Sequence, residues 1–466
     1  FQSKISGAST LTGEALSEKA YEYVKTQVGE DGKNGVNFAK EMLTWILSHT
    51  SAVDATHKTV TTATGSTEIA NLAYGYYVVY PLGATDTSAA PGNGQNYTSV
   101  ASLVSVTDTN ATVNMKSNYP TVVKKVNDKT ADDVNIGDTV TYTLTSKVPD
   151  MTGYTSYVFN FKDTLSAGLT FKEITSVTVG AGENVQNVTE GTGDNTYTLA
   201  QTGQNITITM NNFLASNANK VGQEIKVTYT VTLNKDAVTG FDANKNSATV
   251  EYSNKPGTDN KGESEPSIVD VHTFNFTIFK YYLKGADKTG LANAEFELYK
   301  ANEAGNAADE NAKINIVKVK DGEYRQATPE EAAAEGFKSD VIVSGSNGKV
   351  LVKGLDAGTY YLRETKAPEG YNKLLSDIKV EIKANYDETT GKLTSYSVDY
   401  TYNGKTTNGA AITNKTDSPE VAVENKTGAQ LPSTGSKGAL MVTLAGIVLF
   451  GALTASKAFG KKKAKN

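Results

Sequence analysis

The chain has 466 residues, a length typical of two to four domains. Its 45 basic and 51 acidic residues give a net charge of −6, which argues against nucleic acid as a partner. It has no cysteine and only three histidines, far apart in sequence. Disulfides, thiolate catalysis and Cys-ligated zinc are therefore excluded, and we expect neither a cofactor nor a metal site.

The first unit, residues 1–116, is predicted to be α+β. Residues 13–28 and 36–49 have helical patterns, and apolar residues in the second recur at i, i+3 and i+4. A run of tyrosines and valines at 74–80 predicts a strand. The sequence begins at Phe1 without a Met, so we expect that a leader has been removed or that this is a fragment.

Two β-rich units follow. Residues 117–265 contain strand-like runs separated by Gly, Asn and Asp at the spacing of a sandwich. Residues 266–416 form a third β unit, in which Thr328-Pro329-Glu330-Glu331 predicts a short capped helix. Residues 417–430 are polar and are expected to be a linker.

Residues 431–466 carry a three-part pattern. Leu431, Pro432, Ser433, Thr434 and Gly435 precede an uncharged apolar stretch at 438–456, long enough to span a bilayer as a helix. A lysine-rich tail follows and is expected to stay in the cytoplasm. This order resembles the LPxTG cell-wall sorting signal of Gram-positive surface proteins. The resemblance implies that a sortase cysteine attacks the Thr434 carbonyl and releases Gly435, leaving a secreted, wall-anchored protein.

The two β units resemble known pilin domains. Residues 360–371 read YYLRETKAPEGY and resemble the E-box of pilin domains of the collagen-adhesin B type. Residues 136–142 and 163–169 resemble the isopeptide-forming middle domain of the same proteins. Together with the sorting signal, the chain resembles the backbone pilins that sortases polymerise on Gram-positive bacteria. This implies a mainly β fold of tandem immunoglobulin-like sandwiches, similar to the collagen-adhesin A and B domains, each with a Lys–Asn isopeptide bond promoted by an acid.

In the third unit, Lys280 shares one face of the strand predicted at 274–280 with apolar residues. An inward ammonium would be desolvated, which lowers its pKa and leaves a nucleophilic amine. The resemblance makes Asn414 the electrophile and Glu364 the acid that polarises its carbonyl and shuttles the proton. Asn425 is a rival electrophile, but it follows the last predicted strand and we prefer Asn414. The alternative is a surface lysine paired with Glu364.

In the second unit, strand parity points Lys124 inward and Lys125 to solvent. Asn246 and Asn254 have the same parity, so periodicity does not choose between them, and the family pattern favours Asn246. Asp163 is the candidate acid. The alternative is that these are ordinary surface lysines of a β-sandwich.

The resemblance also implies an acceptor lysine near the boundary of the first two domains, usually in a Tyr-Pro-Lys string. No lysine follows Tyr119-Pro120 here, and Lys116 sits at the matching place in a proline-containing linker. Lys124 and Lys125 are fallback acceptors.

A structural function is therefore predicted: the backbone subunit of a surface pilus with a role in adhesion. Thr434 of one subunit would be joined to Lys116 of the next. The expected partners are pilus-specific and housekeeping sortases, identical subunits, minor pilins and peptidoglycan; the sequence does not identify a host ligand. The chain carries no GxSxG, HExxH, P-loop or EF-hand motif, so an enzyme is not expected. The alternative is a monomeric wall-anchored adhesin or a basal or minor pilin.

Overall fold

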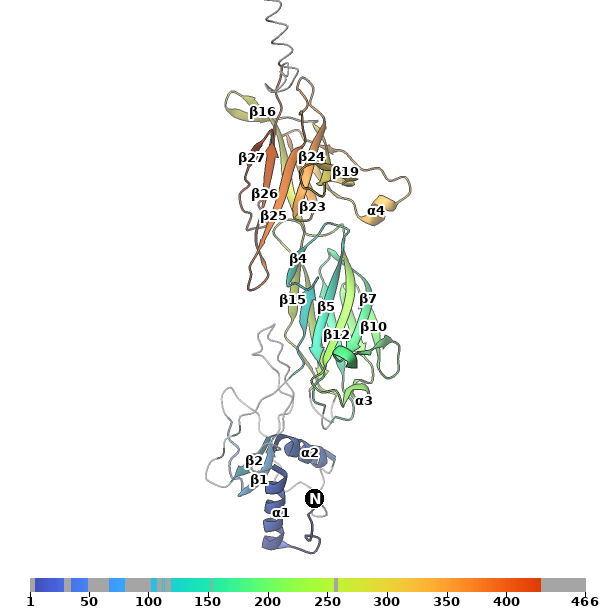
Figure 1. Ribbon diagram of the computed structural model, residues 1–466, viewed down its shortest axis with the longest axis vertical. Coiled ribbons are helices and arrows are strands. Elements are labelled where there is room, and N and C mark those ends of the chain that lie inside the picture. Colours follow the sequence, from blue (N-terminus) through green and yellow to red (C-terminus); the bar gives the residue numbers. More distant parts are fainter. Residues whose placement is uncertain are drawn as a thin grey trace, which may run out of the picture.

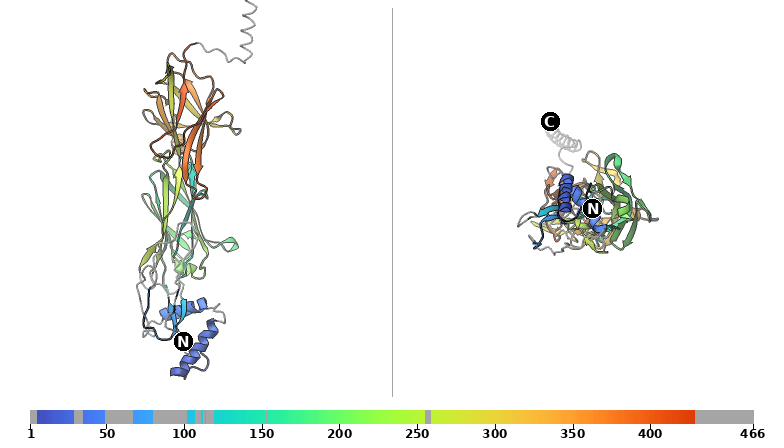
Figure 2. Two further views of the ribbon diagram at one scale, coloured as in Figure 1. Left: turned by 90° about the vertical axis from the view of Figure 1, so that its left-hand side faces the viewer. Right: turned by 90° about the horizontal axis from the view of Figure 1, so that it is seen from below.

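The computed structural model describes residues 5–28, 35–48, 67–79, 102–106, 111, 113, 119–151, 154–254 and 259–428. These residues form a small α+β body and two β-sandwiches that follow one another along the long axis (Figures 1 and 2). The predicted mainly β architecture is confirmed. No helix in these ranges is long and apolar enough to cross a membrane. The membrane helix predicted at 438–456 lies outside them.

The first body combines two helices with one strand pair. α1 (Gly13–Val28) and α2 (Gly35–Ser48) match the helices predicted from periodicity. β1 (Gly75–Val79) pairs antiparallel with β2 (Ser102–Val106). A small core joins α2 to both strands: Ala39, Leu43, Val78 and Leu103.

The second body is a sandwich of two sheets. One sheet has the order β3-β5-β12-β7-β8, and the other has the order β4-β15-β13-β6-β11-β10-β9, with β14 added beside β13. Alternation of buried and exposed residues along β5, β12 and β13 packs the two inner faces into one core. The elements are β3 (Val123–Val126), β4 (Ala131–Asp133), β5 (Thr139–Lys147), β6 (Phe159–Leu165), β7 (Leu169–Val179), β8 (Gln186–Asn187), β9 (Thr189–Glu190), β10 (Thr196–Thr202), β11 (Asn205–Met210), α3 (Phe213–Asn217), β12 (Glu224–Leu233), β13 (Asn244–Ser253), β14 (Lys261–Glu263) and β15 (Ser267–His272).

The third body is a second sandwich with its own core. Its sheets have the orders β17-β16-β23-β21-β20, with β28 beside β16, and β19-β18-β24-β25-β26-β27, with β22 beside β18. The predicted capping box forms at the start of α4 (Pro329–Ala333). The strands are β16 (Phe274–Lys284), β17 (Asp287–Gly290), β18 (Glu295–Ala301), β19 (Ala308–Lys313), β20 (Ile316–Lys320), β21 (Glu323–Gln326), β22 (Ile342–Val343), β23 (Lys349–Leu355), β24 (Gly358–Lys366), β25 (Ile378–Tyr386), β26 (Leu393–Tyr402), β27 (Lys405–Thr407) and β28 (Glu420–Glu424).

The structure corrects two predicted boundaries. Residues 267–272, which we assigned to the third unit, form β15 and pair with β13 and β4 in the second sandwich. β14 and β15, both later than residue 254, therefore belong to the second sandwich, because each pairs with β13. The segment expected to be a linker contains β28, which pairs with β16 and buries Val421 and Val423. The sequence analysis did not predict this strand, because its two buried valines alternate with less buried residues over only five positions.

The two sandwiches are in direct contact. The Ile136 amide donates a hydrogen bond to the Gly354 carbonyl (3.0 Å), and the Tyr386 hydroxyl donates one to Asp133 (2.6 Å). Gly137 has φ +94°, and a Cβ there would lie 2.3 Å from Cδ of Pro329. Backbone of the second sandwich thus packs closely against α4 of the third.

Candidate functional sites

The third sandwich holds a fully buried lysine next to a buried acid. Lys280 lies on β16 with 0% of its surface exposed, and its Nζ is 3.0 Å from Oε1 of Glu364 on β24. Within the described residues this ammonium makes no hydrogen bond. Burial, opposed in part by the charge of Glu364, lowers the pKa of Lys280 to about 8. A larger share of this lysine is therefore a neutral amine near pH 7 than of an exposed lysine.

Glu364 faces both a lysine and an asparagine. Its Oε1 lies toward Lys280, while its Oε2 accepts hydrogen bonds from the Leu374 amide (2.7 Å) and from Nδ2 of Asn425 (3.2 Å). Because one carboxyl group contacts the amine and the carboxamide nitrogen, it can exchange protons with both.

Asn425 reaches this site through the last strand. β28 runs parallel beside β16, with Val423 opposite Lys280, and the Asn425 amide donates a hydrogen bond to the Tyr281 carbonyl (2.9 Å). The side chain of Asn425 is 2% exposed, and its Oδ1 has no hydrogen-bond partner among the described residues. The first and last strands of the sandwich thus bring a nucleophile and an amide to one carboxyl group.

Asn414, the residue predicted to be the electrophile, does not lie at the Lys280–Glu364 pair. Asn414 is exposed, and its side chain forms a local turn by donating to Asp417 (2.8 Å) and accepting from the Thr416 amide (2.9 Å). The segment around Ile412 makes only an isolated bridge to Tyr396, whereas the strand that closes the sheet is β28. The rival residue Asn425 occupies the position expected of the electrophile.

The second sandwich holds a similar cluster. Lys124 lies on β3 with 2% of its surface exposed, and its Nζ donates hydrogen bonds to Oδ2 of Asp163 and to the Tyr229 hydroxyl, both at 2.6 Å. The Nζ also lies 5.0 Å from the ring centroid of Tyr142. Burial, opposed by Asp163, lowers the pKa of Lys124 to about 8. Lys125 is exposed, as its parity predicts.

Asn246 joins this cluster through a tyrosine. It is 0% exposed on β13, and its Nδ2 donates a hydrogen bond to the Tyr229 hydroxyl (3.0 Å). β13 lies beside β6 with Ala248 opposite Asp163, so Asn246 and Asp163 are close on the inner face. Asn254 follows the far end of β13 and is partly exposed. The structure therefore brings Asn246, and not Asn254, to the same tyrosine as Lys124.

The sequence analysis did not identify Tyr229 as a site residue. Its position on β12, between the buried Val227 and Val231, is that of an ordinary core residue. The signal that distinguishes it is its pairing opposite Tyr142 on β5, where the two rings stack at 5.4 Å. Two aromatic rings cover the lysine, and one of them supplies a hydroxyl to it.

The acceptor lysine and the sorting signal lie outside the described residues. These are Lys116 and residues 431–435. Of the fallback acceptors, Lys124 is buried and therefore closed to another protein, while Lys125 is accessible.

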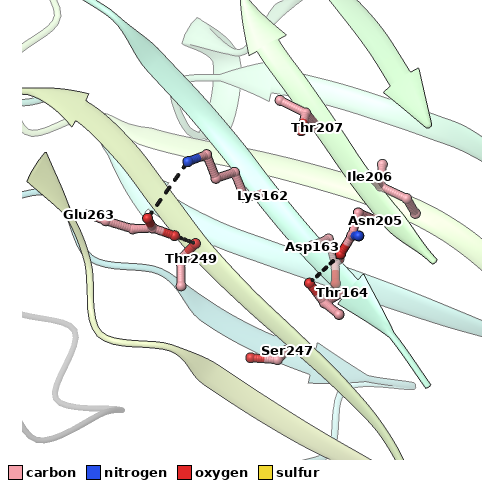
Figure 3. Close-up of a pocket in the computed structure, with 9 residues that line it drawn as sticks. All are labelled: Lys162, Asp163, Thr164, Asn205, Ile206, Thr207, Ser247, Thr249 and Glu263. Carbon is pink, nitrogen blue, oxygen red and sulfur yellow. Dashed lines mark hydrogen bonds and ion pairs between the residues drawn. The ribbon is translucent and has the colours of Figure 1, made fainter. Parts of the chain in front are cut away.

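A polar depression on the outer face of the second sandwich offers no comparable chemistry. It has a volume of about 260 Å³ and lies over β6, β11 and β13 (Figure 3). Its lysine, Lys162, is held by Glu251 (2.7 Å) and Glu263 (3.7 Å). The remaining lining residues are Asp163, Thr164, Asn205, Ile206, Thr207, Ser247 and Thr249.

Two protein-family models match the sandwiches. The Gram-positive pilin backbone subunit 2, Cna-B-like domain, matches residues 136–256, and the SpaA prealbumin-like fold domain matches residues 281–396. Both models come from pilin-type domains, and each covers one of the two Lys–acid–Asn clusters in part.

Individual relatives agree with the family models. The chain is 28% identical over 314 residues, 62% of its length, to the trypsin-resistant surface T6 protein of Streptococcus pyogenes serotype M6. It is 29% identical over 265 residues, 54% of its length, to the fimbrial subunit type 2 of Actinomyces naeslundii. The chain spans about half the length of these curated relatives, 50% and 48%. The solved T6 backbone pilin of S. pyogenes shares the fold, with a TM-score of 0.51 at 18% identity, over 84% of this chain and 89% of that one.

Proposed function

This chain belongs to the Gram-positive backbone pilins, and we propose that it forms the shaft of a covalently polymerised surface pilus. The observation that carries the proposal is the pair of buried Lys–acid–Asn clusters, one in each sandwich. Each cluster is suited to form an internal crosslink, which is of use to a subunit that must transmit tension.

The crosslink in the third sandwich is a bond between Lys280 and Asn425. The neutral amine attacks Cγ of Asn425, a new C–N bond forms, and the bond from Cγ to Nδ2 breaks. Glu364 takes a proton from Nζ and delivers one to Nδ2, so that ammonia leaves and no other reactant is needed. The contacts of Glu364 with both nitrogens support this assignment.

The crosslink in the second sandwich is a bond between Lys124 and Asn246, with Asp163 as the acid. It joins β3 of one sheet to β13 of the other. Desolvation supports both reactions, because a dry site keeps part of each lysine neutral and excludes competing water.

Polymerisation would use groups outside the sandwiches. A pilus-specific sortase would cleave after Thr434 and transfer its carbonyl to Lys116 of the next subunit, and a housekeeping sortase would attach the finished polymer to peptidoglycan. The donor follows the third sandwich and the acceptor precedes the second, so successive bonds would place both sandwiches in the load-bearing path.

The test is polymer formation in cells that carry the cognate pilus sortase. Wild-type protein should give a high-mass ladder on denaturing gels, and Lys116→Ala should give monomer still attached to the wall through Thr434. Lys125→Ala is the matched control and should keep the ladder. A ladder that persists in Lys116→Ala and disappears in Lys125→Ala would move the acceptor to Lys125. Wild-type protein that stays monomeric would favour a wall-anchored adhesin or a basal pilin.

A further inference from the structure

The two clusters differ in how the acid reaches the amide. In the third sandwich, Glu364 contacts both Lys280 (3.0 Å) and Asn425 (3.2 Å). In the second, Asp163 contacts Lys124, and the hydrogen bond of Asn246 goes to the Tyr229 hydroxyl instead.

Side-chain length explains why a bridge is needed. Aspartate is one methylene shorter than glutamate, so an acid on β6 that pairs with Lys124 does not also bond the asparagine on β13. The Tyr229 hydroxyl fills this gap: it donates to Asp163, and it accepts from Nζ of Lys124 (2.6 Å) and from Nδ2 of Asn246 (3.0 Å). One phenol oxygen thus touches the acid, the nucleophile and the leaving group.

We propose that Tyr229 is a catalytic residue of crosslink formation in the second sandwich, where it relays a proton from Asp163 to the leaving nitrogen of Asn246. The inference rests on the proposed Lys124–Asn246 bond. As Nζ attacks Cγ, Asp163 takes a proton from Nζ. The phenol O–H then turns from Asp163 toward Nδ2 and gives up its proton there, and Asp163 returns a proton to the phenol oxygen. The C–N bond to Nδ2 breaks, ammonia leaves, and both Asp163 and Tyr229 return to their starting forms.

The surroundings suit this role. Burial first, and then the charge of Asp163, raise the pKa of Tyr229 well above its ordinary value, so the phenol keeps its proton until the leaving group takes it. The ring is held by stacking on Tyr142. Of these two tyrosine hydroxyls, that of Tyr229 bonds Lys124 and Asp163.

The experiment follows the mass of the full chain during cell-free synthesis stopped at intervals. Wild-type protein should lose about 34 Da, two molecules of ammonia, and Tyr142→Phe should do so at the wild-type rate. Tyr229→Phe should lose the first ammonia, from the third sandwich, at the normal rate and the second at least ten-fold more slowly. Loss of both at the wild-type rate in Tyr229→Phe would overturn the relay.

A double variant separates chemistry from folding. In the Asn246→Ala background, which cannot crosslink, adding Tyr229→Phe should lower the melting temperature of the second sandwich only modestly, because the bonds of the hydroxyl to Lys124 and Asp163 are lost while the stacked ring stays. A large drop there would make Tyr229 a structural residue and overturn the inference. If wild-type protein shows no mass loss from the second sandwich at all, the proposed crosslink itself fails, which is a different outcome from normal crosslinking in Tyr229→Phe.

Discussion

At the scale of residues, the main feature of this protein is a pair of lysines, Lys124 and Lys280, with almost no exposed surface. A buried ammonium is costly, and each is placed against a single carboxylate and aromatic rings. Each sandwich therefore carries the desolvation cost of a buried ammonium. The proposed crosslinks would remove that cost by converting each lysine amine into a neutral amide.

Asn425 should be the partner of Lys280. Asn425→Ala should abolish the loss of about 17 Da assigned to the third sandwich, because it removes the carboxamide that the amine attacks. Asn414→Ala, the control, should lose ammonia normally, because Asn414 is exposed and bonded within its own turn. Intact-mass spectrometry with peptide mapping distinguishes them; a normal loss in Asn425→Ala together with none in Asn414→Ala would restore the original assignment.

The stability of Asn425→Ala should rise with pH. In the folded state the pKa of Lys280 is about 8, below its ordinary value of 10.5, so between these values the unfolded chain binds more protons. The unfolding free energy should increase by about 1–3 kcal/mol from pH 8 to pH 10. Urea unfolding across this range measures it. Adding Lys280→Met to Asn425→Ala should remove most of this increase in unfolding free energy. An equal increase in the double variant would show that Lys280 is not its cause.

At the scale of elements, strand order decides what a crosslink can protect. β16 opens the third sandwich, β28 closes it, and the two are parallel neighbours. The proposed bond from Lys280 to Asn425 would enclose nearly the whole domain in one covalent loop, which would restrict the unfolded chain by on the order of 4 kcal/mol. In the second sandwich the proposed bond would end at Asn246, so β15 would lie outside the loop.

This arrangement predicts how the sandwiches stretch. When the chain is pulled from its ends, only residues 247–279 of the two sandwiches can lengthen, giving an extension on the order of 100 Å. Asn425→Ala should add a second step on the order of 500 Å, because residues 281–425 are released. Single-molecule force spectroscopy measures both steps. A long step from the wild-type third sandwich would show that its loop is not closed.

At the scale of the whole molecule, the two sandwiches meet at an acidic junction. Asp356, in the turn between β23 and β24, lies beside Asp133 of the second sandwich. The Asp356 amide donates to the Asn135 side chain (3.2 Å), so the turn is held by groups from the other sandwich. Burial first, and then the hydrogen bond and charge of Asp133, raise the pKa of Asp356 to about 8.

Docking of the two sandwiches should therefore weaken as pH rises. Because the folded-state pKa of Asp356 is raised, its contribution is fully present below its ordinary value of 3.8 and is lost as pH rises toward about 8. Small-angle X-ray scattering of the full chain should indicate a more variable angle between the two sandwiches at pH 8.5 than at pH 5.

Asp356→Asn is the matched variant for this junction. It should remove most of the pH dependence, since the amide keeps the shape of the side chain without its charge. The comparison also separates Asp356 from the nearby His272, whose pKa is lowered by burial. An unchanged pH dependence in Asp356→Asn would assign the effect to another group.

The sequence by itself determined the β architecture, the inward direction of Lys124 and Lys280, and the capped helix at Thr328. All three follow from local rules: alternation along a strand places a side chain on one face, and a capping box needs residues three apart. The resemblance in the E-box added Glu364, which the structure sets beside Lys280.

Only the tertiary structure decided which partners these residues meet. Asn425 rather than Asn414 lies at Glu364, because β28 pairs with a strand about 140 residues earlier, and no local pattern encodes that pairing. Tyr229 became visible as a bridge only when β12 and β13, from opposite sheets, were brought face to face. Periodicity fixes the face of a strand on which a side chain lies, whereas long-range packing fixes which other side chains it touches.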